Sequence, residues 1–167
     1  MHKYEEANIE RVTTEIQDSI KRCIDSKKGL FLTGTTGTGK TYVCYAISNI
    51  GKGKDTWKPT VVHNFVELLI ESRDAMSKGN YLDKIEQLCS EEKLIIDDIG
   101  AEKTSEHVIE FLYVLINNRY NSQKRTILTT NLDAGAFEER YGGRILSRIA
   151  EMCEVVELRG VDRRVEN

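Results

Sequence analysis

The sequence has no excess of positive charge, a single proline and no long apolar run. Its net charge is −3 at pH 7, which excludes nucleic-acid-binding proteins that depend on a strongly basic overall charge. No apolar stretch approaches the length that spans a membrane, and the opening residues, MHKYEEANIERV, are too charged to form the core of a signal peptide. We therefore expect a cytoplasmic protein with no membrane partner.

Cysteine and histidine are also scarce. The four cysteines, at positions 23, 44, 89 and 153, lie far apart and form no paired motif with one another or with histidine. This spacing predicts neither a zinc site nor a disulfide framework. We expect the four side chains to be reduced and mostly buried, where cysteine behaves as a small apolar residue. The three scattered histidines are expected to have surface or structural roles.

Short apolar runs alternate with segments of helical periodicity along most of the chain. The runs stop at turn residues and predict five strands, within residues 30–32, 60–65, 93–99, 125–131 and 153–160. Apolar residues at spacings of three and four predict helices over 5–26, 40–50, 66–76, 81–88, 105–120 and 134–152, with a break near 142–143 and a further helix starting within 161–167. The alternation predicts one α/β domain, with a parallel sheet sandwiched between helices.

The most specific local pattern is GTTGTGKT at residues 34–41, which fits G-x-x-x-x-G-K-[ST] at every fixed position. Glycines let the backbone curl so that successive amides point at phosphate oxygens, and the helix that follows adds the positive end of its dipole. We expect Lys40 to reach the β- and γ-phosphates and Thr41 to offer its hydroxyl to Mg²⁺. A chance glycine-rich turn is the alternative. A strand before the pattern and a helix after it favour a nucleotide site made of Gly34, Thr35, Thr36, Gly37, Thr38, Gly39, Lys40 and Thr41.

Two adjacent carboxylates, Asp97 and Asp98, end the apolar run LII. A phosphate loop needs an acid on a neighbouring strand to hold Mg²⁺, and the carboxyl end of a strand is where α/β sheets place ligands. Side chains alternate along a strand, so the two acids should point in different directions and have different roles. We assign Asp97 to the Mg²⁺ shell, through water, and Asp98 to the water that attacks the γ-phosphate. The alternative for Asp98 is a capping or turn carboxylate.

The fourth predicted strand also ends in polar residues, of which Asn131 is the last. Its amide lies next to the acid-bearing strand, where it would hydrogen-bond the attacking water or the γ-phosphate. The alternative is an asparagine that caps the next helix or forms a turn. The residues alone leave both interpretations open.

Several arginines gather late in the chain. Arg144 and Arg148 are four residues apart and share a helix face, while three others stand at positions 159, 163 and 164. Such arginines usually form a solvated face paired with nearby glutamates, here at positions 138, 139, 151 and 157. The alternative is that one of them contacts the γ-phosphate of a neighbouring subunit. The pattern does not choose among them.

The sequence resembles the DnaC/DnaI/IstB-like AAA+ ATPases, which include bacterial and phage replicative-helicase loaders and the ATPase helpers of some transposases. The resemblance is carried by GLFLTGTTGTGKT, KLIIDDIGAE, NNRYNSQKRTILTTNL, RILSRIAEM and LRGVDRR, in this order, over nearly the whole chain. It implies an AAA+ core with a five-stranded parallel sheet and no full C-terminal lid domain. We expect a helical lead-in at residues 1–26 and the ATPase domain at 27–167.

The resemblance also assigns roles to site residues. It makes residues 34–41 the Walker A motif and Asp97 with Asp98 the Walker B motif, and an aspartate in the second place is usual for this family. Asn131 falls on the sensor-1 position and Arg148 on the arginine-finger position, with Arg144 as the second choice. Arg164 falls on an arginine that contacts the bound nucleotide, although Arg163 stands where an aromatic or aliphatic residue often precedes it.

The function implied by the resemblance is that of a Mg²⁺-dependent ATPase that loads a replicative helicase in DNA replication. Such a protein binds ATP and ADP, hydrolyses ATP slowly until a partner stimulates it, self-associates through Arg148 and contacts single-stranded DNA. An IstB-type transposition helper has the same core and is the first alternative. A small-molecule P-loop kinase is a weaker alternative, because the paired aspartates and the TTN strand end are not what that class needs.

Overall fold

The computed structural model describes residues 4–26, 28–50 and 60–160. The helix expected within 161–167 lies outside these residues, as do Arg163 and Arg164. Within the described ranges, no helix has the length and apolar character needed to cross a membrane.

Five strands form one parallel sheet, as predicted. They are β1 (Gly29–Thr33), β2 (Val62–Asn64), β3 (Lys93–Ile99), β4 (Arg125–Thr130) and β5 (Cys153–Glu157). Their order across the sheet is β2-β3-β4-β1-β5, and every neighbouring pair is parallel. The three central strands are therefore β3, β4 and β1. Their carboxyl ends open on the same edge, where the phosphate-loop pattern and the paired aspartates begin.

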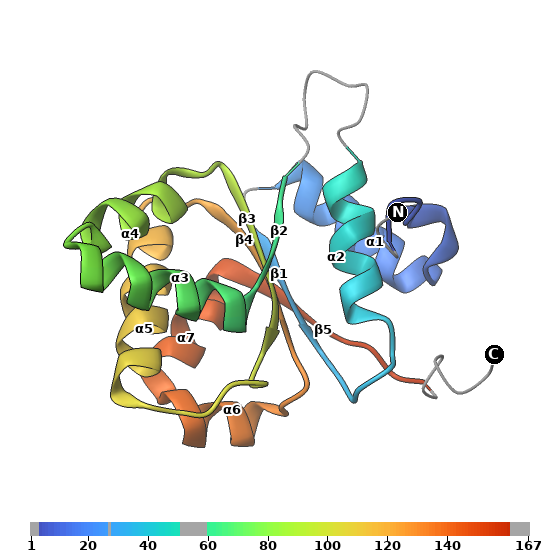
Figure 1. Ribbon diagram of the computed structural model, residues 1–167. Coiled ribbons are helices and arrows are strands. Elements are labelled where there is room, and N and C mark those ends of the chain that lie inside the picture. The colour runs from blue at the N-terminus through green and yellow to red at the C-terminus, as the bar shows by residue number, and fades with distance from the viewer. Residues whose placement is uncertain (1–3, 27, 51–59, 161–167) are drawn as a thin grey trace.

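Helices cover both faces of the sheet (Figure 1). One face carries α1 (Thr14–Asp25) and α2 (Lys40–Asn49). The other face carries α3 (Phe65–Lys78), α4 (Tyr81–Ser90), α5 (Glu106–Asn121), α6 (Ala134–Tyr141) and α7 (Gly143–Met152). The alternation of β1 explains the two cores, because Leu30 and Leu32 pack toward α1 and α2 while Phe31 packs toward the opposite layer.

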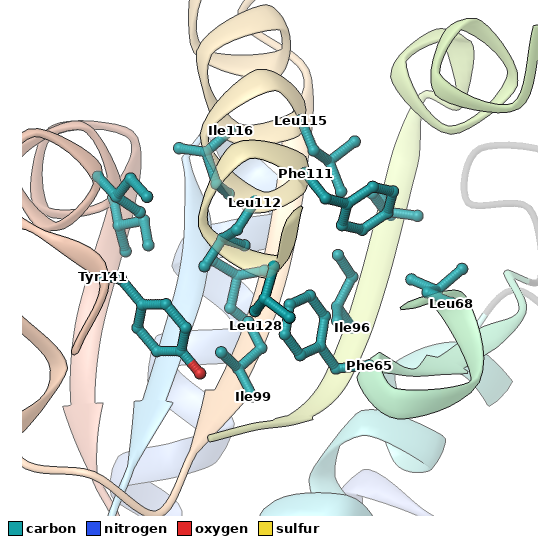
Figure 2. Packing of buried hydrophobic residues seen from close by; sticks show 14 of the residues in the cluster. Phe65, Leu68, Ile96, Ile99, Phe111, Leu112, Leu115, Ile116, Leu128 and Tyr141 are labelled. Atoms are coloured by element: carbon teal, nitrogen blue, oxygen red, sulfur yellow. The ribbon is translucent and has the colours of Figure 1, made fainter. Parts of the chain in front are cut away.

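The larger core lies between the sheet and α5. Phe111 and Leu112 of α5 point at Ile96 of β3 and Leu128 of β4, and Phe65 at the start of α3 closes the same cluster (Figure 2). All five side chains are fully buried. This packing fixes β3 and β4 side by side, which matters because both strands end at the candidate site.

The start of the first helix differs from the prediction. A single helix over 5–26 is wrong, because α1 begins at Thr14 and a separate short 3-10 turn, η1 (Ile9–Arg11), precedes it. The Asn8 side chain caps this turn by accepting from the amide of Glu10, and the backbone then becomes extended at Val12 and Thr13. The apolar periodicity across residues 9–24 therefore predicted one helix where the structure has two separate elements, η1 and α1.

The cysteines agree with their prediction within the described residues. All four are free, and those at 23, 44 and 153 are buried. Burial raises the pKa of the Cys23 thiol to about 11, so it is neutral at physiological pH.

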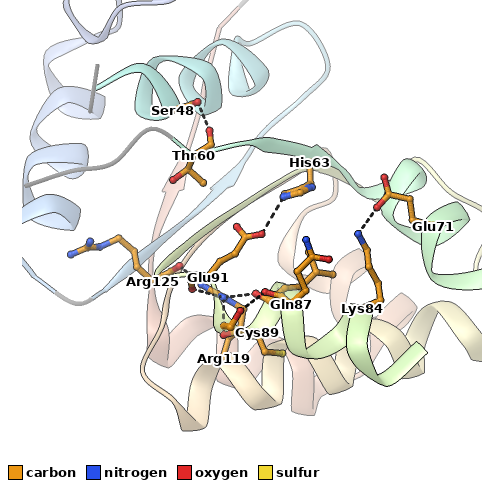
Figure 3. Close-up of polar contacts among 12 residues, drawn as sticks. Ser48, Thr60, His63, Glu71, Lys84, Gln87, Cys89, Glu91, Arg119 and Arg125 are labelled. Carbon is orange, nitrogen blue, oxygen red and sulfur yellow. Dashed lines mark hydrogen bonds and ion pairs between the residues drawn. The ribbon is translucent and has the colours of Figure 1, made fainter. Parts of the chain in front are cut away.

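Arg119 of α5 is completely buried and holds the amino-terminal ends of β3 and β4 in place (Figure 3). Its Nε donates to Thr126 Oγ1 at 2.9 Å, and one Nη donates to the carbonyls of Leu88 and Glu91 at 2.7 and 2.9 Å. The other Nη donates to the carbonyl of Arg125 at 2.6 Å. Burial lowers its pKa to about 10, so the side chain is still a cation at neutral pH.

Removing this guanidinium leaves several buried carbonyls without donors. We expect Arg119→Met to lower the free energy of unfolding by about 3 kcal/mol, measured by urea denaturation. Arg73→Met is the matched control, because Arg73 is exposed on α3 and should change the unfolding free energy by less than about 0.5 kcal/mol. Equal effects of the two substitutions would contradict a structural role for the Arg119 network.

Candidate nucleotide-binding site

The phosphate loop joins β1 to α2 and has the backbone that its glycines were predicted to provide. Gly34, Gly37 and Gly39 all have positive φ, and Gly39 is the residue before the first turn of α2. Gly34 is required for a second reason, because a Cβ there would lie 2.3 Å from the carbonyl oxygen of Leu158. The loop is thus held against the segment that follows β5.

Lys40 is the first residue of α2 and is buried against its own loop. Its Nζ donates to the carbonyls of Gly34 and Thr35 at 2.6 and 2.8 Å. Thr38 is also turned inward and donates to the Thr35 carbonyl at 2.9 Å. These bonds hold the loop in a curled conformation around the ammonium group of Lys40.

Asp97 lies at the end of β3, only 7% exposed, and joins two hydroxyls from different elements. Thr41 of α2 donates to its Oδ2 at 2.8 Å, and Thr129 of β4 donates to its Oδ1 at 2.6 Å. The two residues predicted to serve Mg²⁺, Thr41 and Asp97, are therefore in direct contact. The Cys44 sulfur lies 3.9 Å beneath the carboxylate, where burial raises the pKa of the thiol and keeps it neutral.

These groups suit Mg²⁺ better than a metal held by protein ligands alone. Within the described residues, no group of three or more His, Cys, Asp or Glu could hold a metal ion. Mg²⁺ prefers oxygen ligands and usually keeps several waters, with one or two carboxylates and substrate phosphates completing its shell. The hydroxyl of Thr41 and the carboxylate of Asp97, next to a phosphate loop, fit that requirement.

The backbone at Asp98 departs from that of a regular strand. Its φ is +66°, and the pairing of β3 with β4 shifts register between Ile96 and Ile99. Its backbone amide donates to Thr129 Oγ1 at 2.8 Å, the same hydroxyl that donates to Asp97. The two aspartates line one cavity, and the strand is irregular where they stand, so strand alternation alone does not set the direction of the Asp98 side chain.

A cavity of about 600 Å³ brings most of the predicted residues together. This size suits a nucleotide-sized ligand. Its lining includes the predicted residues Thr36, Gly37, Gly39, Lys40, Thr41, Asp97, Asp98 and Asn131.

Asn131 follows β4 directly and is exposed at the cavity. It is not the N-cap of α6, because Asp133 occupies that position and accepts from the amide of Ala136 at 2.8 Å. Asn131 therefore does not cap the next helix. It lines the same cavity as Asp98.

Five lining residues were not predicted as site residues by the sequence analysis, namely Tyr4, Arg11, Tyr42, Ala101 and Thr129. Tyr42 follows the phosphate loop directly, and its hydroxyl accepts from the amide of Asn8 at 3.1 Å. Tyr4 stacks on Tyr45, with 5.1 Å between ring centroids, so the N-terminal segment is fastened to α2. Because Tyr42 is adjacent to the loop in sequence, its place at the cavity could have been predicted. The positions of Tyr4 and Arg11 depend on tertiary packing, which the sequence pattern does not show.

The late arginines lie away from this cavity or outside the described residues. The Arg148 guanidinium lies 5.3 Å from the ring centroid of Tyr113 and 6.0 Å from that of Tyr120, both on α5. Arg144 is exposed on the same helix, α7. Arg159 pairs with Glu157 at 2.8 Å, as the ion-pair interpretation predicted.

Comparison with known proteins identifies relatives of two kinds. DnaI of Bacillus subtilis (strain 168), described as a replicative helicase loader, is 27% identical over 150 residues, which is 82% of this chain and 48% of that protein. A putative ATP-binding protein of insertion sequence IS5376 from Geobacillus stearothermophilus is 30% identical over 126 residues, 74% of this chain and 48% of that protein. The chain spans about half the length of each of these relatives.

The fold matches a solved helicase loader. The crystal structure of the DnaC helicase loader superposes with a TM-score of 0.80 at 24% identity, covering 95% of this chain and 100% of that one. At this identity the match supports the α/β fold of the AAA+ domains. The profile of one family, described as IstB-like ATP binding protein, matches residues 10–167. Because this profile matches more than half of the chain, including the loop at residues 34–41, the chain belongs to the IstB-like ATP binding proteins.

Proposed function

We propose that the chain is a Mg²⁺-dependent ATPase that acts as a replicative helicase loader. The observation that carries the ATPase is the contact of Thr41 with Asp97 at 2.8 Å, beside a phosphate loop and in one cavity with Asp98 and Asn131. The loader role rests on the likeness to DnaI, a helicase loader by its description, and on family membership. ATP would act mainly as an assembly switch that slow hydrolysis resets.

Each of these residues has a separate role in the proposed phosphoryl transfer. The loop amides and the first turn of α2 hold the phosphates, and Lys40 turns from the carbonyls of Gly34 and Thr35 toward the β- and γ-phosphates. Thr41 and, through water, Asp97 would hold Mg²⁺, which would neutralise charge on the phosphates. Asp98 orients the attacking water and accepts its proton, while the Asn131 amide hydrogen-bonds the water or the γ-phosphate.

The base and ribose would lie against Tyr4, Arg11 and Tyr42, which also line the cavity. Aromatic rings and a guanidinium offer stacking surfaces to a purine. Arg164 is proposed as a further contact to the nucleotide on the strength of the resemblance alone.

Two substitutions should distinguish the residues needed for nucleotide binding from those needed for hydrolysis. Asp98→Asn should lower kcat by about 100-fold or more while the Kd of a fluorescent ATP analogue changes by less than about threefold, because the phosphates and the metal are held elsewhere. Lys40→Ala should abolish binding itself. Both are measured by steady-state phosphate release and by analogue titration.

The control is Asp83→Asn, an exposed aspartate on α4, which should leave both quantities unchanged. An Asp98→Asn variant that hydrolyses ATP at the parent rate would remove Asp98 from the chemistry. The Walker B role would then rest on Asp97 alone.

Arg148 is proposed to reach the γ-phosphate bound by a neighbouring subunit, with Arg144 as the second choice. In its own chain Arg148 lies against two tyrosines of α5 and does not line the cavity. Self-association would therefore complete the site, since an arginine that stabilises transition-state charge can be supplied by a partner.

Mixing variants tests this contact. Arg148→Ala alone should lose about 100-fold or more in kcat, and Lys40→Ala alone should be inactive. A mixture should regain activity, because a Lys40→Ala subunit still offers Arg148 to an intact site next to it. Arg73→Ala should behave as the parent chain. Full activity of homogeneous Arg148→Ala would refute the proposal, and a mixture that stays inactive would argue against action between subunits.

A transposition helper is the second candidate, favoured by the insertion-sequence relative at 30% identity. The two functions share the ATPase and differ in the partner. We expect the immobilised chain to retain a purified replicative helicase from the same source in ATP, and to release it in ADP or when Lys40 is replaced by Ala. Retention of the cognate transposase instead would establish the helper role, and retention of neither would refute both.

Contact with single-stranded DNA is proposed on the resemblance alone. Its readout is the rate of phosphate release from ATP, which should rise when a single-stranded oligonucleotide is added. The kinase alternative would be revived by phosphoryl transfer to a small acceptor, with no response to DNA or helicase.

A further inference from the structure

The carboxylate of Glu102, in the loop that follows β3, is buried although the loop is on the surface. Its side chain is 5% exposed. Oε2 accepts from the amide of Gly100 at 3.0 Å, and Oε1 accepts from the hydroxyl of Tyr141 at 2.5 Å and from Arg140 Nη2 at 3.1 Å. Arg140 also donates to the Glu102 carbonyl. A carboxylate withdrawn from water to this degree needs such partners, and Glu102 has three donors.

These bonds tie together two segments that are remote in sequence. Glu102 is 38 residues from Arg140 and 39 from Tyr141, and both partners are on α6. Burial and the bond to the Glu102 carboxylate raise the pKa of the Tyr141 phenol, so it remains protonated and donates. The arrangement, here named the Glu102 clasp, consists of Glu102, Arg140 and Tyr141.

The clasp joins the two segments that lead away from Asp98 and Asn131, the polar residues proposed to act at the γ-phosphate. Asp98 is the second-last residue of β3, directly before the loop that Glu102 anchors, and Asn131 lies three residues before α6, which carries the other half of the clasp. Gly100, two residues after Asp98, packs against Asn131 and Leu132. A Cβ on Gly100 would lie 3.2 Å from Asn131 Oδ1 and 3.1 Å from the Leu132 side chain, and its φ of +108° is one that glycine adopts.

An ion pair is not the arrangement that stability alone would favour here. Replacing a buried ion pair by apolar residues of similar volume is often neutral or stabilising. What the charged, directional bonds add is a fixed position for the Gly100 amide relative to α6. Because Asp98 precedes Gly100 by two residues, that constraint passes to its carboxylate.

We propose that the Glu102 clasp positions Asp98 relative to Asn131 for ATP hydrolysis, so that Glu102, Arg140 and Tyr141 are positioning residues of the site. The inference rests on the proposed ATPase, because the clasp acts through Asp98. It predicts a defect in kcat with little change in nucleotide binding, since the phosphate loop, Thr41 and Asp97 are held by other bonds.

The test uses Glu102→Gln and Tyr141→Phe in the full chain, with Glu139→Gln as matched control, an exposed glutamate on α6. We expect each clasp variant to lower kcat by about 10-fold, because small misplacements of reacting groups are costly, while the Kd of a fluorescent ATP analogue stays within about twofold. Arg140→Lys, which keeps the charge, should lose less than Arg140→Ala. Melting temperatures identify any variant that fails to fold, and Tyr141→Phe is the mildest change.

A second measurement separates positioning from a merely structural role. In an Asp98→Asn background, Glu102→Gln should give no further loss in the residual single-turnover rate, because the group it positions is already gone. If the losses in rate from Asp98→Asn and Glu102→Gln multiply, the two residues act independently and the proposal is overturned. It is also overturned if Glu102→Gln and Tyr141→Phe both keep the kcat of the parent chain while Asp98→Asn is impaired. A parent chain that hydrolyses no ATP, alone or with its partner, would overturn the proposed ATPase and the clasp together.

Discussion

The carboxylate of Asp97 is the point where the phosphate loop is fastened to the sheet. It is almost fully buried, so its charge must be matched by donors, and the donors come from α2 and β4. Thr129 extends the linkage by one bond, since it also accepts from the amide of Asp98. One carboxylate thus sets the distance between the loop, the acid strand and the strand that leads to Asn131. The rest of the site is built around that spacing.

The same two strands are held by polar groups at both ends. At their amino ends the Arg119 guanidinium bonds carbonyls on either side, and at their carboxyl ends Asp97 and Thr129 bond each other. Between these points the strands contribute only apolar side chains such as Ile96 and Leu128 to the core. These directional side-chain bonds add to the backbone ladder between β3 and β4 at both ends of the pair.

Much of this arrangement was readable from the sequence, because the signals are local. The phosphate loop and the five strands follow from short patterns whose physics involves neighbouring residues. Two such patterns also predicted that Thr41 and Asp97 serve one metal ion, but not the direct hydrogen bond between them. The irregular backbone at Asp98 was not readable, because alternation assumes a regular strand. The start of α1 was missed since its periodicity continued through a capped turn. The contacts of Glu102 with α6 and of Arg148 with the tyrosines of α5 join residues far apart in the sequence, which no local pattern specifies.

The N-terminal segment has a practical consequence for anyone shortening this protein. Asn49 donates to the carbonyl of Ala7 at 2.9 Å, and Tyr42 bonds the backbone of Asn8, so residues before the first long helix are docked on α2. A version beginning at Thr14 would keep all five strands, the loop at residues 34–41, and both Asp97 and Asp98. It would nonetheless lose two of the side chains that wall the cavity, Tyr4 and Arg11, and would leave a tyrosine face of α2 open to water. Such a version would also lose Ala7 and Val12 from the buried core, so the N-terminal segment belongs both to the folded domain and to the wall of the cavity.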